Sequence, residues 1–328
     1  MNSLEPIPMK YRAPAEGFPK GWYCLAEAED IKPGALTPVS YLGEQFIIYR
    51  DKNGAVQAAD AYCPHMGAHL ASHDGCIQDG VVICPFHKWN FDGASGDCVR
   101  IPYSELPPSQ VGLKLYPTRE VDGMVLIWYH PQGTAPEFEP YTSPLNAGGK
   151  WVLYDTKQWV TTCPFRDILE NLFDTAHIVQ LHNAAEMPAV NSVQRLGYGL
   201  CIDYATDPAN SEVGLKQFQC NFSGITLLCQ YWEGQHFETL FIHSFTPIDE
   251  ERFVQKTRFY IKDSGSQALI ESVGKAFTDR FVFEVEQDLR VLDFKKHLPQ
   301  PRLCAGDGPI HQVRKYAREF YRVNNNVA

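Results

Sequence analysis

The sequence predicts an α+β protein with two domains, an all-β domain followed by an antiparallel sheet covered by helices. Between Trp22 and Tyr129 the chain consists of short alternating apolar and polar runs that are broken by turn residues. After a segment rich in proline and glycine at 131–149, longer alternating runs are mixed with helical patterns. The length of 328 residues also corresponds to about two domains.

The boundaries follow from these changes of pattern. We divide the chain into an N-terminal arm, the all-β domain, a linker and the second domain, at 1–20, 21–132, 133–150 and 151–328. In the all-β domain, the dipeptides Asn53-Gly54 and Asp79-Gly80 predict hairpin turns. In the second domain we expect three or four antiparallel strands and three helices, at 212–262 and at 166–182, 268–296 and 309–323.

Composition and charge exclude several classes of protein. The net charge is −10 and no basic stripe is visible, which argues against a nucleic-acid partner. The longest apolar runs, such as Met124–Tyr129, are far shorter than the roughly 20 residues of a membrane span. The N-terminus lacks the apolar core of a signal peptide. Ten cysteines are too sparse for a disulfide scaffold, so we expect a cytoplasmic protein with reduced thiols.

Two Cys-His pairs stand at the tips of predicted hairpins. Cys63 and His65 are followed, 18 residues later, by Cys84 and His87. Zinc fingers usually pair cysteine with cysteine and histidine with histidine, whereas here each loop supplies one of each. This order allows two thiolates to hold one iron of a [2Fe–2S] cluster and two imidazoles to hold the other. A structural zinc site and ordinary buried thiols are the alternatives.

A second group of candidate site residues lies on the helix predicted at 166–182, with Asn171 and Asp174 as candidate catalytic residues and His177 and His182 as candidate metal ligands. Asn171, Asp174 and His177 are spaced to share one helix face, and His182 follows His177 by five residues. In a regular helix the two imidazoles would point about 140° apart. Both can bind one metal only if the helix ends or bulges at 178–182, and we predict this irregularity. Two histidines with a carboxylate are the ligands of non-haem Fe(II) oxygenases.

Asp174 has a separate predicted role. It lies one turn before His177, where a carboxylate can accept the second ring N–H of that histidine and fix its tautomer. The remaining cysteines, including Cys76 and Cys98 near the two loops, are expected to be ordinary thiols.

The segment CPHMGAHL, followed by CPFHKWNFDGASGDC, resembles the Rieske motif of ring-hydroxylating non-haem iron oxygenases. The absence of extra cysteines in the two loops resembles the oxygenase branch rather than respiratory Rieske proteins. The resemblance implies a Rieske β domain, a helix-grip-like catalytic domain, a [2Fe–2S] cluster and a mononuclear Fe(II). The stretches IPYSELPP, DGMVLIWYHPQG, CPFRDILENLFDTAH and LCAGDGPI resemble the steroid-acting branch, which includes 3-ketosteroid 9α-hydroxylase oxygenases and cholesterol 7-desaturases.

The resemblance also implies the third iron ligand. In the family this ligand is an acidic residue on a late helix, and Asp288 falls at the matching position after Gln287. Glu284, Glu286 and Asp293 are the nearby alternatives.

The same resemblance implies the assembly and the electron donor. The family pattern is a homotrimer in which His87 of one chain meets Asp174 of the next, which gives electrons a route between subunits. Because the chain carries no G-x-G-x-x-G nucleotide signature after a strand, we expect electrons from a separate reductase or ferredoxin, ultimately from NAD(P)H. Lys88 and Arg100 are the cations nearest to the expected docking site.

The leading functional hypothesis is a monooxygenase that uses O2 to hydroxylate or desaturate a steroid-like polycycle. One alternative is the same chemistry on an aromatic acid, or as an O- or N-demethylase. Another is a Rieske electron carrier without catalysis, although a carrier needs only about the first 110 residues. Aromatic residues of the 212–262 strands are candidates for an apolar pocket, but most are expected to pack in the core.

Overall fold

The computed structural model describes residues 17–105, 110–146, 149–163, 165–184, 189–205, 209, 214–304 and 306–321. The chain divides into two compact units. The first comprises Lys20–Ser143 and Thr246–Asp249, and the second is built mainly from Pro144–Phe245 and Glu250–Ala328. Each unit is described separately below.

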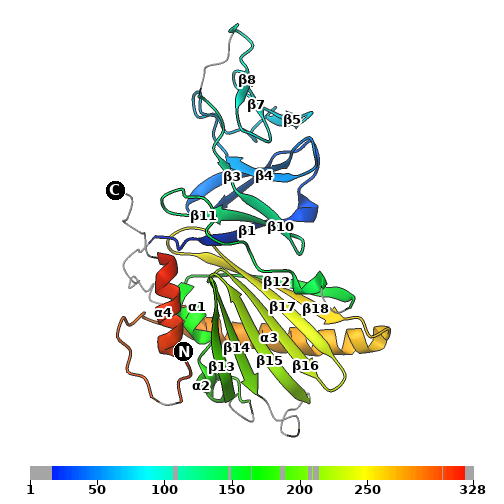
Figure 1. The fold of residues 1–328 in the computed structure, drawn as a ribbon, viewed down its shortest axis with the longest axis vertical. Helices are drawn as coiled ribbons and strands as arrows, with labels where there is room; N and C mark the ends of the chain where they lie inside the picture. The colour runs from blue at the N-terminus through cyan, green and yellow to red at the C-terminus, as the bar shows by residue number, and fades with distance from the viewer. Residues whose placement is uncertain are drawn as a thin grey trace, which may run out of the picture. The chain divides into compact units, whose positions relative to one another are not determined.

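Three small antiparallel sheets make up the first unit (Figure 1). Their strand orders are β1-β11-β10, β2-β3-β4-β9 and β5-β6-β7-β8. A 3₁₀ turn, η1 (Ala28–Asp30), follows the first strand. The strands are β1 (Gly21–Glu27), β2 (Thr37–Tyr41), β3 (Glu44–Arg50), β4 (Val56–Asp60), β5 (Cys76–Gln78), β6 (Val81–Ile83), β7 (Asn90–Asp92), β8 (Cys98–Arg100), β9 (Leu115–Tyr116), β10 (Thr118–Val121) and β11 (Met124–Tyr129).

The hairpin turns of this unit follow from its Asx-Gly dipeptides. Asp79 and Gly80 form a two-residue loop between the paired residues Gln78 and Val81. Their φ angles of 48° and 78° are both left-handed, as a type I′ turn requires. The hairpin predicted at Asn53-Gly54 also forms, between β3 and β4. The predicted all-β domain is therefore confirmed.

Part of the segment that the sequence assigns to the linker packs within the first unit. Nε1 of Trp22 donates to the carbonyl of Phe138 at 2.7 Å, and Nε1 of Trp128 donates to the carbonyl of Thr134 at 3.0 Å. Both tryptophans are buried. Their indole N–H groups need acceptors away from water, and the segment after β11 supplies them.

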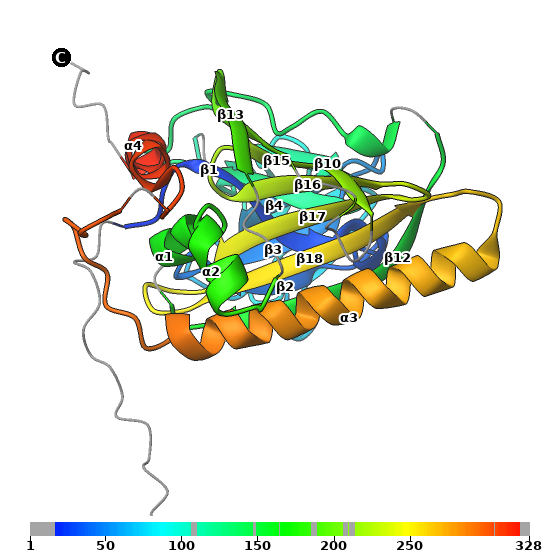
Figure 2. The same cartoon turned by 90° about the horizontal axis from the view of Figure 1, so that it is seen from below.

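One seven-stranded antiparallel sheet dominates the second unit, in the order β12-β18-β17-β16-β15-β14-β13. The helix α3 crosses one face of this sheet (Figures 1 and 2). Four strands come from the predicted region, whereas the strand at 151–161 and the hairpin at 189–205 were not predicted. The strands are β12 (Trp151–Thr161), β13 (Ala189–Leu196), β14 (Gly199–Ala205), β15 (Leu215–Ser223), β16 (Leu227–Gly234), β17 (Glu238–Pro247) and β18 (Phe253–Lys262).

The helices differ from expectation in one place. The predicted helix at 166–182 is two short helices, α1 (Phe165–Asn171) and α2 (Thr175–Gln180). The chain breaks between them because Asp174 caps α2 through its carboxylate, which accepts from the amides of Ala176 and His177. The other two helices form as predicted, α3 at Gln267–Leu292 and α4 at Ile310–Tyr321, and a 3₁₀ turn, η2, lies at Pro144–Asn146. No helix within the described ranges has the length and apolarity needed to cross a membrane.

Candidate metal centres

The two Cys-His loops of the first unit have the same backbone hydrogen bonds. The amide of Cys63 donates to the carbonyl of Ala68, and the carbonyl of Cys63 accepts from Gly67, both at 2.9 Å. In the other loop the amide of Cys84 donates to Trp89 and its carbonyl accepts from Lys88. Each loop thus turns around its cysteine in the same way.

The fifth residue of each loop adopts a left-handed conformation. Gly67 has a φ of 72°, and Lys88 has a φ of 56° at the equivalent position. A left-handed conformation is costly for lysine, so the surrounding hydrogen bonds must hold it in place. Strain of this kind is common where a loop positions functional groups.

The two cysteines face each other in the core of the unit. Cys63 and Cys84 are 2% and 1% exposed, and the neighbouring Cys84 thiol is one of the groups that raise the pKa of Cys63. Burial raises the pKa of Cys63 to about 11, although the backbone N–H groups of His65 and Met66 oppose this effect by donating to its sulfur. N–H groups aimed at a sulfur stabilise a bound thiolate. All ten cysteines of the chain are free thiols.

The two histidines of these loops also lie together. The rings of His65 and His87 are 4.8 Å apart between centroids. His65 stacks on Trp89 at 4.4 Å with an interplanar angle of 9°, and Nε1 of Trp89 donates to the hydroxyl of Tyr103 at 2.7 Å. Nδ1 of His87 is buried and has no hydrogen-bond partner among the described residues. A paired set of thiols and imidazoles with an unsatisfied ring nitrogen fits a Rieske cluster.

In the second unit, the end of α2 places two histidines near one point. The amides of Leu181 and His182 both approach the carbonyl of His177, at 2.7 and 3.4 Å. The second contact spans five residues, so the helix widens and stops after Gln180. The predicted irregularity at 178–182 is confirmed. It is the reason that His177 and His182 can face each other, with ring centroids 5.0 Å apart.

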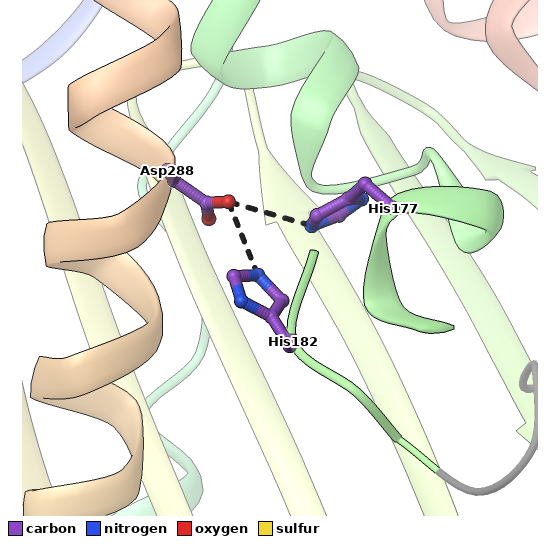
Figure 3. Close-up of side chains that lie close together, drawn as sticks. All are labelled: His177, His182 and Asp288. Carbon is purple, nitrogen blue, oxygen red and sulfur yellow. Dashed lines mark ion pairs between the residues drawn. The ribbon is translucent and has the colours of Figure 1, made fainter. Parts of the chain in front are cut away.

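Asp288 of α3 completes this group (Figure 3). Its Oδ1 lies 3.1 Å from Nε2 of His182 and 3.8 Å from Nε2 of His177. One ligand atom from each of the three residues lies within 4.8 Å of the others. Oδ1 of Asp288 is buried and lacks a hydrogen bond to the described residues, as expected of an atom that awaits a cation. The donor set of two imidazoles and one carboxylate fits Fe(II).

Hydrogen bonds fix the orientation of both rings. Nδ1 of His177 makes a short bond to the main-chain carbonyl of Asp174, and Nδ1 of His182 lies 3.0 Å from Oε1 of Gln287. Because both partners only accept, each Nδ1 carries the proton and each Nε2 presents its lone pair. Both Nε2 atoms lie near Oδ1 of Asp288, where a shared metal would bind.

One sequence expectation is wrong in its details. The carboxylate of Asp174 was expected to accept the ring N–H of His177, but the main-chain carbonyl of Asp174 does so. The carboxylate is engaged in capping α2, because the first amides of a helix need an acceptor. Asn171 nevertheless reaches the centre from α1. Its Nδ2 donates to Oδ2 of Asp288 at 2.9 Å and lies 3.5 Å from Nε2 of His177.

The charge state of His182 reflects this coupling. Burial lowers the pKa of its imidazole, but the adjacent carboxylate of Asp288 and the side chain of Gln287 outweigh that effect, so the pKa is raised. The carboxylate therefore attracts positive charge at Nε2, which a proton or a metal cation can supply.

Two residues of α3 support the centre and were not assigned a role from the sequence. Gln287 orients His182, and Nη2 of Arg280 donates to the carbonyl of His182 at 2.7 Å. The sequence alone could not indicate these two residues, because their roles depend on where His182 lies relative to α3.

A second buried group, Asp167, Glu170 and His297, also has ligand atoms within 4.8 Å of one another. Two cationic side chains already neutralise the negative charge of this group. Nζ of Lys295 lies 2.9 Å from Asp167, and Nη2 of Arg314 lies 2.8 Å from Glu170. We interpret this group as an ion-pair network that ties α1 to α4 and to the segment after α3.

Two protein-family models match successive parts of the chain. Residues 21–117 match the Rieske [2Fe-2S] domain, and residues 127–321 match the 3-ketosteroid 9alpha-hydroxylase C-terminal domain. Two curated relatives are 30% identical to this chain. Cholesterol 7-desaturase nvd 1 of Ciona intestinalis aligns with 94% of this chain and 70% of its own length. The oxygenase component of 3-ketosteroid-9-alpha-monooxygenase of Rhodococcus rhodochrous aligns with 96% and 83%.

Solved structures share the fold at lower identity. Dicamba monooxygenase bound to dicamba has a TM-score of 0.70 at 18% identity, and the alignment covers 92% of this chain and 96% of that one. NdmA of Pseudomonas putida CBB5 with caffeine has a TM-score of 0.73 at 19% identity, with 92% and 90% coverage. With its two domain matches and these two relatives at 30% identity, the chain belongs to the Rieske non-haem iron oxygenases, enzymes that use a [2Fe–2S] cluster and a mononuclear iron.

Proposed function

We propose that Cys63, His65, Cys84 and His87 hold the Rieske cluster and that His177, His182 and Asp288 hold the mononuclear iron. The facing thiols and the unpartnered Nδ1 of His87 support the first assignment. The convergence of two Nε2 lone pairs on an unpartnered carboxylate oxygen supports the second. When bound, these groups supply one-electron storage and O2 activation.

The residues of the chain orient and tune these groups. Gln287 and the carbonyl of Asp174 hold the protons at Nδ1, so that both Nε2 atoms remain free to bind. Asn171 donates to the outer oxygen of Asp288, which leaves Oδ1 for the metal. The ion-pair network of Asp167 and Glu170 fixes α1, on which Asn171 lies.

We propose that the substrate is a steroid-like polycycle, which is hydroxylated or desaturated. The observation that carries this proposal is the match of residues 127–321 to the 3-ketosteroid 9alpha-hydroxylase C-terminal domain. The two relatives at 30% identity, which are named for a ketosteroid and for cholesterol, point to the same substrate class. The aromatic side chains between the sheet and α3 suit an apolar ring system.

We further propose a homotrimer in which His87 of one chain meets Asp174 of the next. Oδ1 of Asp174 caps α2, and Oδ2 makes no hydrogen bond within the described part of the chain, so it can serve a neighbour. Phe86 and Met66, beside the cluster ligands, are 61% and 67% exposed, as expected of a surface that another protein covers.

Electrons would come from a separate reductase or ferredoxin that docks near Lys88 and Arg100. A relative is named as the oxygenase component of such a system. The ten free thiols suit a reducing compartment, and we place the protein in the cytoplasm.

Product analysis tests the substrate class. The holoenzyme, with a reductase and NADH, is incubated with ketosteroids, sterols, methoxybenzoates and N-methylxanthines. We expect one oxygenated or desaturated product from a steroid and none from the other compounds. Demethylation of a benzoate or a xanthine, without turnover of any steroid, would refute the steroid assignment and support the demethylase alternative.

A further inference from the structure

One cross-strand row of the large sheet carries buried polar groups without partners. Tyr204, Phe218 and Trp232 are paired in register across β14, β15 and β16, and Trp232 is paired with Thr239 of β17. Directly paired residues of antiparallel strands lie on one face of the sheet. The hydroxyls of Tyr204 and Thr239 and Nε1 of Trp232 are buried and make no hydrogen bond to the residues that the structure describes.

This row lies on the face that α3 covers. The ring of Trp232 packs 6.1 Å from Phe277 of α3 and 5.9 Å from Phe241 of β17, between centroids. Thr278, the next residue of α3, is also buried, and its hydroxyl likewise has no described partner. Three unsatisfied polar atoms therefore lie along the row, and a fourth lies on the helix that covers its face.

The rings of the row stack face to face. Tyr204 and Phe218 stack at 4.9 Å with an interplanar angle of 16°, and Phe218 and Trp232 stack at 3.9 Å with 21°. Trp232 and Phe277 are only half-buried, so one end of the stack remains accessible. Such a stack presents ring edges, and the polar atoms on them, to a ligand that lies along the row.

The neighbouring His243 shows that other buried polar groups of this region do have hydrogen-bond partners. It lies at the same interface, beside Phe281 of α3. Its Nδ1 lies 2.8 Å from the hydroxyl of Thr257, and its Nε2 lies 3.0 Å from Oε1 of Gln230. Buried polar groups are normally paired in this way. The polar groups of the row at Trp232 lack such partners among the residues described. This absence points to a ligand that supplies them.

We propose that Tyr204, Phe218, Trp232 and Thr239 recognise the end of the substrate that is remote from the reacting carbon. This inference rests on the proposed polycyclic substrate. Phe277 and Asp288 are eleven residues apart on α3, which is about 16 Å along the helix axis, so the row binds substrate and takes no part in iron binding.

The chemistry of the row defines the group that it binds. Nε1 of Trp232 only donates, so its partner is an acceptor oxygen. The row contains no cation, and a buried carboxylate without a cation would be costly. The ligand oxygen is therefore that of a neutral ketone or hydroxyl at one end of the ring system.

The test uses Trp232→Phe, which keeps a ring and removes the N–H. Dissociation constants are measured anaerobically by calorimetry on the holoenzyme, for a four-ring steroid diketone with a ketone at each end and for its two monoketones. We expect the variant to bind the diketone and one monoketone about three- to tenfold more weakly, and the other monoketone unchanged. Tyr204→Phe, which removes a single hydroxyl, gives a second test if Trp232→Phe folds poorly.

Trp151→Phe is the matched control. Nε1 of Trp151 is also buried without a described partner, but the residue lies on β12, the edge strand of the sheet. This variant should bind all three ketones as the wild type does. Equal weakening for all three ligands in Trp232→Phe would show that the row only packs, and would overturn the inference while leaving the proposed function intact. A wild-type enzyme that binds no polycycle refutes both.

Discussion

The side chain of Gln287 lies 3.0 Å from Nδ1 of His182, and its neighbour Asp288 lies 3.1 Å from Nε2 of the same ring. Two consecutive residues of α3 thus approach both nitrogens of one histidine. One contact sets the tautomer, and the other brings a proposed metal ligand beside Nε2. This relationship makes Gln287 a positioning residue whose contribution can be measured.

Replacing Gln287 by Ala should weaken iron binding about 10- to 100-fold, because His182 loses the acceptor that orients its ring. The measurement is an Fe(II) titration of the apo-protein, followed by kcat with saturating iron. Gln287→Glu keeps an acceptor and should retain most of the affinity. Glu286→Gln, at an exposed site on the same helix, is the control. Unchanged iron affinity in Gln287→Ala would contradict the positioning role.

Asp174 combines a structural and a proposed electron-transfer role, and two substitutions separate them. Asp174→Asn keeps an N-cap oxygen and should leave stability nearly unchanged, whereas Asp174→Ala should cost about 1 kcal/mol. In single-turnover experiments, both variants should reoxidise the reduced cluster much more slowly than the wild type. Wild-type reoxidation in Asp174→Asn would rule out the bridge to His87.

The sequence predicted the local backbone features near these sites better than the long-range contacts around them. The turn at Asp79-Gly80 and the irregularity before His182 could be predicted because each depends on a few consecutive residues. The break between α1 and α2 was missed because helical periodicity continues across Asp174, whose capping bonds become evident only in three dimensions. Gln287 was missed as a partner of His182 for the same reason, since 105 residues separate them.

The two metal centres should be separable by mutation. His177→Ala removes one of three proposed iron ligands, so oxygenation should be abolished while the visible absorption of the cluster remains. Cys84→Ser should do the reverse and lose the cluster spectrum while Fe(II) still binds to the second unit. Metal analysis, acid-labile sulfide and visible spectra check both variants. Turnover that survives in His177→Ala would mean that oxygen reacts elsewhere.

His243 makes a pH-dependent contribution to stability whose sign follows from its burial. Burial lowers the pKa of this fully enclosed imidazole to about 3, whereas in the unfolded chain its pKa is about 6.5. Between these values the unfolded state binds a proton that the folded state does not, so stability falls as pH decreases through this range. The expected slope from this residue is about 1.4 kcal/mol per pH unit between pH 6 and 4.

Urea unfolding of the wild type and of His243→Gln, measured across this pH range, checks that slope. Glutamine can keep a hydrogen bond to Thr257 or Gln230 but cannot take up a proton, so the variant should have a flatter pH profile. The variant is expected to be less stable at pH 7, because it loses part of the buried network. The test therefore compares how steeply the stability of each protein changes with pH. Parallel profiles for the two proteins would show that His243 titrates normally in the folded state.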